Sequence, residues 1–308
     1  MELTVTTPPP PIALPGKNVY PAHIYAVSSD GTLKWFRHDS ADEGKSDWQG
    51  PRDVGTGWNK YKFVFPGGAN VIYAITNEGV LQWFRHTGYQ TGLDSWEGPI
   101  DVGRGWLNLT QVFSAGDGII YAINSTGKLL WYRHNGILSG AGLEIAGAWT
   151  GPKEVGRGWG SFKSAFSTGE GIIYAVTKEG RLQWYKHNGY LDGSGLENPT
   201  AWKERVDLGP LSGSFKQLFS SGNGIIYDLQ PDGTLTWLRH LSYKVGFNKS
   251  VIPPIAFGNF NNDWRGTFPV NKGWADFNNV FALLPGTNPP HSVLPVKAPA
   301  AGGNPIPP

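Results

Sequence analysis

A segment built on one tyrosine and one tryptophan recurs five times along the chain, and it constrains the fold more than any other feature. The sequence IYAVSSDGTLKWFRH at 24–38 returns, with small changes, at 72–86, 120–134, 173–187 and 226–240. The tyrosines of successive copies are therefore 48, 48, 53 and 53 residues apart. Repeats of this length are typical of solenoids and propellers, in which each unit is one supersecondary element.

The 14 tryptophans occupy three positions of the repeat, which we call the first, second and third tryptophans in chain order. The first lies in a W-x-R/K-H motif, the second follows about ten or more residues later, and the third ends a glycine turn of the form G-W. The first set is Trp35, Trp83, Trp131, Trp184 and Trp237, the second is Trp48, Trp96, Trp149, Trp202 and Trp264, and the third is Trp58, Trp106, Trp159 and Trp274. Ser212 stands where the remaining member of the third set is expected.

Each unit reads as four short strands separated by glycine-rich turns. Runs of β-branched and aromatic residues, such as IYAI (72–75) and LQWFRH (81–86), flank a turn that contains glycine, which is typical of a hairpin. No long stretch shows the 3.6-residue apolar period of a helix, so helices should be nearly absent. Four strands per 48–53 residues is the size of a propeller blade. The sequence therefore predicts an all-β, five-bladed β-propeller of four-stranded antiparallel blades.

The ends of the repeat region indicate how the ring closes. The first repeat begins at HIYAV (23–27), whereas the aromatic strand that precedes IYA elsewhere is found near the C-terminus, at 273–286. We predict that this C-terminal strand completes the first blade and removes both open edges; a six-bladed ring with one incomplete blade is the alternative. The expected domain boundaries are a flexible Pro-rich tail at 1–17, a propeller at 18–287 with repeats near 24–71, 72–119, 120–172, 173–225 and 226–286, and a second flexible Pro-rich tail at 288–308.

Composition argues against several classes of function. The net charge is +2 and no Lys/Arg cluster stands out, so nothing indicates a nucleic-acid partner. The chain has no cysteine, which excludes disulfides and thiolate metal sites, and no cofactor is expected. No apolar run approaches the ~20 residues of a membrane span, and the N-terminus lacks a signal-peptide pattern. We expect a soluble protein without membrane insertion, either cytoplasmic or secreted by a non-classical route, and its oligomeric state stays open.

The repeat pattern W-x-G-P-x-x-V-G-x-G-W-x-x-F, followed by G-x-I-Y-A-V, resembles that of the tachylectin-type five-bladed propeller lectins. Those proteins also begin partway through a blade and end on G-W-x-x-F followed by an aromatic strand. The resemblance covers about residues 23–286, and it departs from the type member in a longer loop before the second tryptophan and in the Arg/Lys-His pair. It implies a multivalent lectin that binds N-acetylhexosamine glycans, of the GlcNAc or GalNAc type, in repeated sites between blades.

Two interpretations of the repeated polar and aromatic residues stay open. The Arg/Lys-His pair lies where a strand enters a loop, so it can hold blades together through backbone carbonyls or donate hydrogen bonds to a sugar. The second tryptophan lies near the same loop and can pack in the core or stack on a sugar ring. We expect the third set to lie too far away to share a small pocket with the second, because it follows the outer strand. The candidate sugar-binding residues are Arg37, His38, Trp48, Arg85, His86, Trp96, Arg133, His134, Asn135, Trp149, Lys186, His187, Asn188 and Trp202.

Two other classes of function are weighed against the lectin. A protein-interaction scaffold usually has blades that differ, because a single partner is asymmetric, whereas these blades are nearly alike. A glycan-processing enzyme is disfavoured because no H-E-x-x-H or G-x-S-x-G motif is present and five of the seven histidines belong to the repeat.

Overall fold

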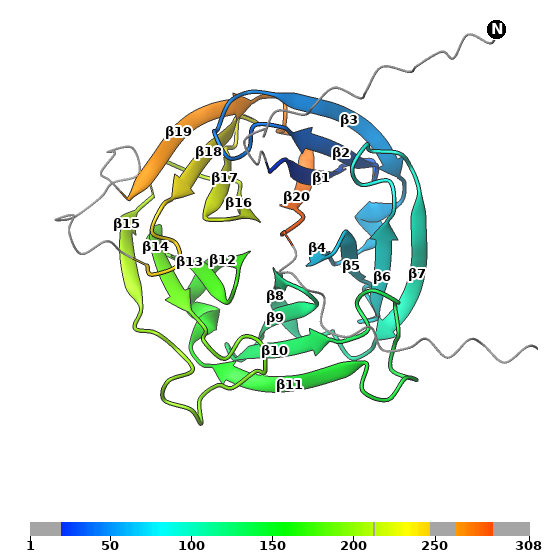
Figure 1. Ribbon diagram of the computed structural model, residues 1–308, viewed down its shortest axis with the longest axis vertical. Helices are drawn as coiled ribbons and strands as arrows, with labels where there is room; N and C mark the ends of the chain where they lie inside the picture. The colour runs from blue at the N-terminus through cyan, green and yellow to red at the C-terminus, as the bar shows by residue number, and fades with distance from the viewer. Residues whose placement is uncertain (1–19, 212, 247–262, 286–308) are drawn as a thin grey trace, which may run out of the picture.

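The five copies of the repeat fold as five four-stranded antiparallel sheets around a central axis (Figure 1). The computed structural model describes residues 20–211, 213–246 and 263–285. Within these residues the helical elements are two 3-10 turns, Trp58–Lys60 and Trp159–Ser161. The prediction of a five-bladed, all-β propeller is confirmed.

Each blade runs from an inner strand beside the central axis to an outer strand at the circumference (Figure 1). Blade 1 contains β20 (Phe277–Ala282), β1 (Ala22–Ser28), β2 (Leu33–His38) and β3 (Trp48–Gly55), and blade 2 contains β4 (Phe63–Gly68), β5 (Val71–Ile75), β6 (Leu81–His86) and β7 (Trp96–Gly103). Blade 3 contains β8 (Leu109–Gly116), β9 (Ile119–Asn124), β10 (Leu129–His134) and β11 (Trp149–Gly156). Blade 4 contains β12 (Phe162–Gly169), β13 (Ile172–Thr177), β14 (Arg181–Lys186) and β15 (Val206–Pro210), and blade 5 contains β16 (Gln217–Gly222), β17 (Ile225–Leu229), β18 (Leu235–His240) and β19 (Trp264–Asn271). The tails predicted at 1–17 and 288–308 lie outside the described residues.

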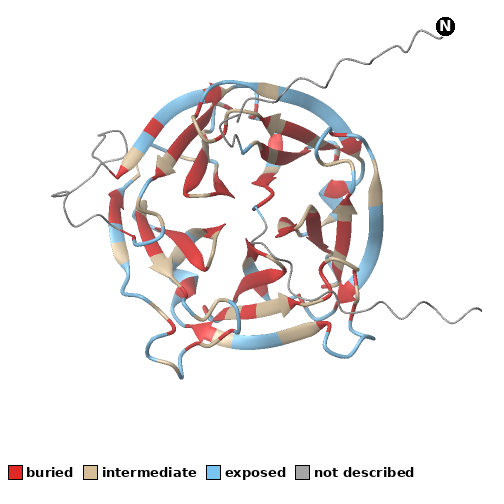
Figure 2. Cartoon of the chain, viewed as in Figure 1, coloured by how far each residue is buried: buried red, intermediate tan, exposed pale blue. Residues whose placement is uncertain are grey.

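The repeated tyrosine and the first tryptophan form the core of each blade. In blade 2, Tyr73 of β5 lies directly opposite Trp83 of β6, so both side chains point to the same face of the sheet. Their exposed fractions are 0% and 1%, and the equivalent pairs of the other four blades are buried as well. Figure 2 shows burial concentrated on the middle strands and exposure along the outer ones. These pairs therefore fill the space between neighbouring blades.

Closure of the ring occurs within blade 1, as the sequence predicted. β20 pairs antiparallel with β1, in a register that places Tyr25 opposite Phe281 and Ala26 opposite Val280. The rings of Tyr25 and Phe281 stack with their centroids 5.6 Å apart. The last described strand of the chain therefore supplies the inner strand of the first blade.

The inner two strands of blades 2 to 5 are joined by tight turns. In blade 2 the turn residues Ala69 and Asn70 have φ angles of 49° and 56°, and in blade 5 Asn223 and Gly224 have 54° and 72°. Two successive residues in the left-handed region are typical of a type I′ hairpin, whose twist matches that of the strands. Blade 1 lacks such a turn, because β20 does not precede β1 in the chain.

The outer strands lie along the circumference of the ring and not parallel to its axis (Figure 1). Strands in a sheet are rotated relative to their neighbours, and the rotation accumulates from the inner to the outer strand of a blade. As a result, the end of β3 lies close to the beginning of β7, and the same relation is seen around the ring (Figure 1). The candidate site is located at these junctions.

Candidate functional site at the blade junctions

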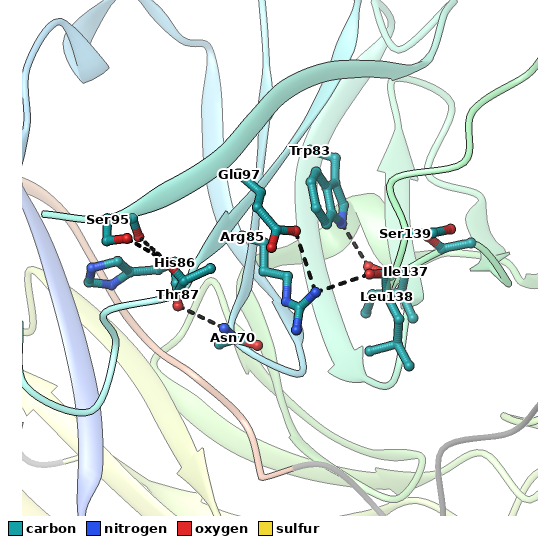
Figure 3. Close-up of polar contacts among 11 residues, drawn as sticks. Asn70, Trp83, Arg85, His86, Thr87, Ser95, Glu97, Ile137, Leu138 and Ser139 are labelled. Carbon is teal, nitrogen blue, oxygen red and sulfur yellow. Dashed lines mark hydrogen bonds and ion pairs between the residues drawn. The ribbon is translucent and has the colours of Figure 1, made fainter. Parts of the chain in front are cut away.

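The W-x-R motif of one blade holds the long loop of the next. We use "long loops" for residues 39–47, 87–95, 135–148, 188–201 and 241–263, each of which follows the R/K-H pair of its blade; of the last, 241–246 and 263 are described. In blade 2, Trp83 Nε1 donates to the carbonyl oxygen of Ile137, at 2.8 Å, and Arg85 Nη1 donates to that of Leu138, at 3.3 Å (Figure 3). Arg85 also forms an ion pair with Glu97.

The same contacts recur around the ring. The first tryptophans Trp35, Trp131, Trp184 and Trp237 donate to the carbonyls of Tyr89, Tyr190, Tyr243 and Ala41 at 2.7–2.8 Å. Arg37, Arg133 and Arg239 donate to the carbonyls of Gln90, Leu191 and Asp42 at 3.0–3.3 Å. Lys186 makes no side-chain hydrogen bond to another described residue, and burial lowers its pKa. These arginine contacts are the ones expected if the Arg/Lys-His pair holds neighbouring blades together through backbone carbonyls.

The repeated histidines are fully buried between blades. His134 has an exposed fraction of 0%; its Nδ1 lies 2.7 Å from the hydroxyl of Tyr73 in the preceding blade, and its Nε2 lies 2.7 Å from the carbonyl oxygen of Ala141. Because a carbonyl only accepts, Nε2 carries the proton and the tyrosine hydroxyl donates to Nδ1. A neutral imidazole is therefore fully satisfied here. Burial lowers the pKa of His134 to about 4.

Three further histidines have the same two partners. The pairs Tyr25–His86, Tyr121–His187 and Tyr227–His38 join neighbouring blades at 2.6–2.8 Å, and the second ring nitrogen of each histidine meets the carbonyl of Leu93, Ser194 or Lys45. Burial lowers the pKa of His38, His86 and His187 as well. In blade 5, His240 pairs with Tyr174, and its Nε2 lies 3.4 Å from Asp263. The histidines thus lock each long loop to the preceding blade.

The second tryptophans stack on these histidines and reach the neighbouring blade. Ring centroids of the five His–Trp pairs are 4.2–4.5 Å apart, with nearly parallel planes. Trp149 Nε1 donates to the carbonyl of Val102 in the preceding blade at 2.7 Å, and Trp48, Trp96 and Trp202 make the same bond to Val270, Val54 and Val155. All five second tryptophans remain partly exposed. In blade 4 the outer strand begins only at Val206, and Trp202 is joined to His187 by an isolated bridge.

The third tryptophans lie beside the second ones, contrary to the prediction from sequence. The ring centroids of Trp58 and Trp96 are 5.8 Å apart, and the pairs Trp106–Trp149, Trp159–Trp202 and Trp274–Trp48 lie at 5.9–6.1 Å. The two sets are separated along one outer strand but meet across a junction, because the outer strands follow the circumference. The expectation that they cannot share one small site is therefore wrong.

The residue after the histidine is not the same in all five blades. Asn135 donates through Nδ2 to the carbonyl of Gly147 and to Thr150 Oγ1, and Asn188 donates to the carbonyl of Thr200. The equivalent positions hold Asp39 in blade 1, Thr87 in blade 2 and Leu241 in blade 5. The junctions therefore share the stacked histidine and second tryptophan and differ in the residue that follows the histidine.

The junction between blades 4 and 5 departs from the others. The backbone N–H of each third tryptophan donates to a glycine carbonyl, as from Trp58 to Gly31, and between blades 4 and 5 it is Leu211 that makes this bond, to Gly180. Leu211, not Ser212, thus occupies the tryptophan position, which corrects the alignment made from sequence; Ser212 itself lies outside the described residues. This junction therefore lacks the third indole.

The sequence did not reveal the role of the repeated tyrosine. In the sequence this tyrosine defines only the spacing of the repeats, whereas in the structure its hydroxyl is one partner in every Tyr–His hydrogen bond. A buried strand tyrosine needs a partner for its hydroxyl, and the repeated histidine was the polar group that recurred with it. The recurrence of a tyrosine and a histidine in every unit was therefore the sequence feature that could have predicted the Tyr–His hydrogen bond.

Comparison with models of known protein families shows which family the chain belongs to. The model of the Tachylectin family matches residues 21–142 and 136–283. The chain belongs to the Tachylectin family. Membership suggests a lectin-like or protein-binding function without catalysis. No curated protein matches the sequence.

Three solved structures are similar to this chain, and the first of them supports the same fold. One match is a protein from a study of the de novo evolutionary emergence of a symmetrical protein shaped by folding constraints, with 18% identity, a TM-score of 0.51 and coverage of 86% of this chain and 99% of that chain. Prp20p from Saccharomyces cerevisiae has 17% identity and a TM-score of 0.36, with coverage of 78% of this chain and 59% of that chain. Human WBSCR16 has 15% identity and a TM-score of 0.35, with coverage of 71% and 60%.

Residues 20–211, 213–246 and 263–285 contain no group of three or more His, Asp or Glu side chains arranged to hold a metal ion. None of the helices in these ranges is long and apolar enough to cross a membrane.

Proposed function

We propose that the blade junctions bind N-acetylhexosamine glycans and that the protein is a multivalent lectin. The observation that carries this proposal is the partly exposed second tryptophan, which recurs at every junction beside a long loop with polar side chains. Sugars combine apolar C–H faces with hydroxyls, so they need an aromatic surface and hydrogen-bonding groups next to it. The Tachylectin family and the repeated geometry support this reading.

The tryptophan is held in place before any ligand arrives. Trp149 stacks on His134 at 4.4 Å and donates its Nε1 hydrogen to Val102, so its ring cannot turn without breaking both contacts. A preorganised surface avoids part of the entropy cost of binding. We assign the buried histidines and the arginines to positioning of the loop, and the exposed tryptophan edge to contact with the sugar.

Asparagine side chains are the best placed polar groups. The amide of Asn135 is fixed by its bonds to Gly147 and Thr150, and its Oδ1 accepts no hydrogen bond from the described residues. This oxygen can accept from a sugar hydroxyl or an N-acetyl N–H. Asn188 donates one hydrogen bond, from Nδ2 to the carbonyl of Thr200, and is exposed. The junctions that carry Trp149 and Trp202 are therefore expected to bind best.

The first test removes the aromatic surface at these two junctions. In the double variant Trp149→Ala and Trp202→Ala, the number of N-acetylglucosamine sites measured by titration calorimetry should fall by two, because each loses its stacking surface. Trp149→Phe keeps an aromatic face and should weaken its site by roughly tenfold, corresponding to about 1.4 kcal/mol.

Leu143→Ala serves as the matched control, because Leu143 is 58% exposed and lies on the same long loop as Asn135. It should leave both stoichiometry and affinity unchanged. Melting curves must show that the tryptophan variants are folded at the temperature of the titration. Unchanged sugar binding by a folded double variant would contradict the assignment and favour a protein partner.

The second test concerns valency. A shallow site for a monosaccharide should have a dissociation constant on the order of 10 μM to 1 mM, whereas a multivalent conjugate should bind about 10²–10⁴ times more tightly because several junctions engage together. We expect three to five sites, with the blade 4–blade 5 junction weakest, since it has Leu211 and Leu241 where other junctions have tryptophan and a polar residue. One tight site per chain, with no gain from the conjugate, would refute the repeated-site proposal.

A further inference from the structure

A cavity of about 200 Å³ lies at the seam where blade 1 closes. Its walls come from the start of β1, the turns β4–β5 and β16–β17, the long loop of blade 2 and the segment after β20. The lining residues include His23, Asn70, Tyr89, Ser221, Asn223 and Leu283. It is therefore distinct from the junction tryptophans and occurs at one place in the ring.

The cavity exists because blade 1 is the blade without an inner turn. In blade 2 the turn residues Ala69 and Asn70 link the two inner strands directly. In blade 1 the corresponding strand ends are joined only by pairing, and beyond β20 the backbone N–H of Leu283 donates to the carbonyl of His23 at 2.9 Å. The chain thus leaves open the position that a covalent turn fills elsewhere.

His23 departs from the repeat at this point. The equivalent residues are Val71, Ile119, Ile172 and Ile225, all of them aliphatic. The imidazole of His23 packs edge-on against Tyr89, with centroids 5.0 Å apart, and its Nε2 is buried with no hydrogen-bond partner among the described residues. A buried polar atom without a partner costs free energy, whereas the aliphatic residue of the other blades does not have this cost.

The polar lining residues are uncharged, and two of them are held in place by hydrogen bonds. Asn70 Nδ2 donates to the carbonyl of His86 at 2.7 Å, and the backbone of Tyr89 accepts from Trp35 at 2.7 Å. Burial lowers the pKa of His23 to about 4, so its ring is neutral near pH 7. The lining thus carries no charged side chain at that pH, and its tyrosines, asparagines and Ser221 offer both donors and acceptors.

We infer that this seam cavity is a single binding site, separate from the repeated junctions, for a small neutral ligand rich in hydroxyl or amide groups. The ligand would pack on Tyr89 and His23 and exchange hydrogen bonds with Asn70 and Asn223. A charged ligand would lose its hydration without meeting an opposite charge among the lining residues, so a neutral one is favoured. The inference does not depend on the lectin proposal, because it uses none of the junction residues thought to contact sugar.

The experiment uses the full chain with isotope-labelled histidines and backbone amides, observed by NMR. Glucose and N-acetylglucosamine are the neutral probes, and glucuronate is an anionic probe of similar size to glucose. The His23 ring signals, identified by their loss in His23→Ile, and the amide signals of Asn70 and Asn223 should shift in a saturable way with a neutral probe. Glucuronate should bind at least tenfold more weakly.

His23→Ile introduces the residue that blades 3 to 5 carry, so it should fold normally, yet the Asn70 and Asn223 amides should report at least tenfold weaker binding. The double variant Trp149→Ala and Trp202→Ala should leave the His23 shifts unchanged, which separates this site from the junctions. Absence of saturable shifts with both neutral probes, equal binding of glucuronate, or unchanged affinity in folded His23→Ile would each overturn the inference.

Discussion

A chain that ends at Asn271, before β20, will not form the folded propeller. β20 supplies the inner strand of blade 1, and it buries Val280 and Phe281 completely or nearly so, at 0% and 4% exposure. Each fully buried side chain of this size contributes about 1.5–3 kcal/mol. With Phe277, Leu283 and Leu284 also buried, the loss is comparable to the whole stability of a typical domain, about 5–15 kcal/mol. The open edge of β1 would in addition favour aggregation.

The control for this truncation is a chain that ends at Pro285, which keeps β20 and Leu283–Pro285 and removes only 286–308. It should melt at the temperature of the full chain, whereas the chain ending at Asn271 should show no cooperative transition by circular dichroism and should aggregate in size-exclusion chromatography. A cooperative transition at the parent temperature in the shorter chain would show that blade 1 does not need β20.

The blade architecture was predictable because it depends on local patterns. The runs that contain Tyr73 and Trp83 predict two neighbouring strands of one sheet. The first repeat lacks the aromatic strand that precedes IYA elsewhere, so the aromatic strand near the C-terminus was predicted to pair with it. The relation between blades was harder to predict. Tyr73 and His134 are 61 residues apart, and no rule of strand periodicity brings a hydroxyl of one blade to the imidazole of the next.

The errors at the site have the same origin. The sequence predicts that the second and third tryptophans lie apart, because they stand at opposite ends of one outer strand. Sheet twist turns each outer strand along the circumference, so that Trp58 at the end of one strand meets Trp96 at the start of the next. The Leu211–Ser212 alignment was displaced by one residue, because a missing tryptophan leaves nothing to mark the position and only the hydrogen bond to Gly180 identifies it. Local sequence determines each blade, while accumulated twist determines what the junctions bring together.

The second large effect is a loss of stability in mild acid. His134 has an ordinary pKa of 6.5 in the unfolded chain and about 4 in the folded protein. Between these values the unfolded state binds more protons, so the free energy of unfolding falls as the pH is lowered. The stability is fully present above pH 6.5 and is lost progressively toward pH 4, by about 3 kcal/mol for this residue.

Several buried groups contribute to this dependence. The pKa values of His23, His38, His86 and His187 are lowered as well, so their effects add to that of His134. Asp228 acts in the opposite direction, since burial raises its pKa to about 6 and its protonation below that pH favours the folded state. Five histidines outweigh one carboxyl, so the melting temperature should fall steeply between pH 6.5 and pH 4.

A variant at one junction isolates the cause. His134→Gln removes the titrating ring and should be less stable than the parent at pH 7.5, because the bonds to Tyr73 and Ala141 are lost or weakened. The difference in free energy of unfolding between parent and variant should then shrink by about 3 kcal/mol at pH 4, measured by denaturant titration at each pH. A difference that stays constant with pH would mean that His134 is not held neutral by burial. In that case protonation of His134 would not weaken the contact between blade 2 and the long loop of blade 3.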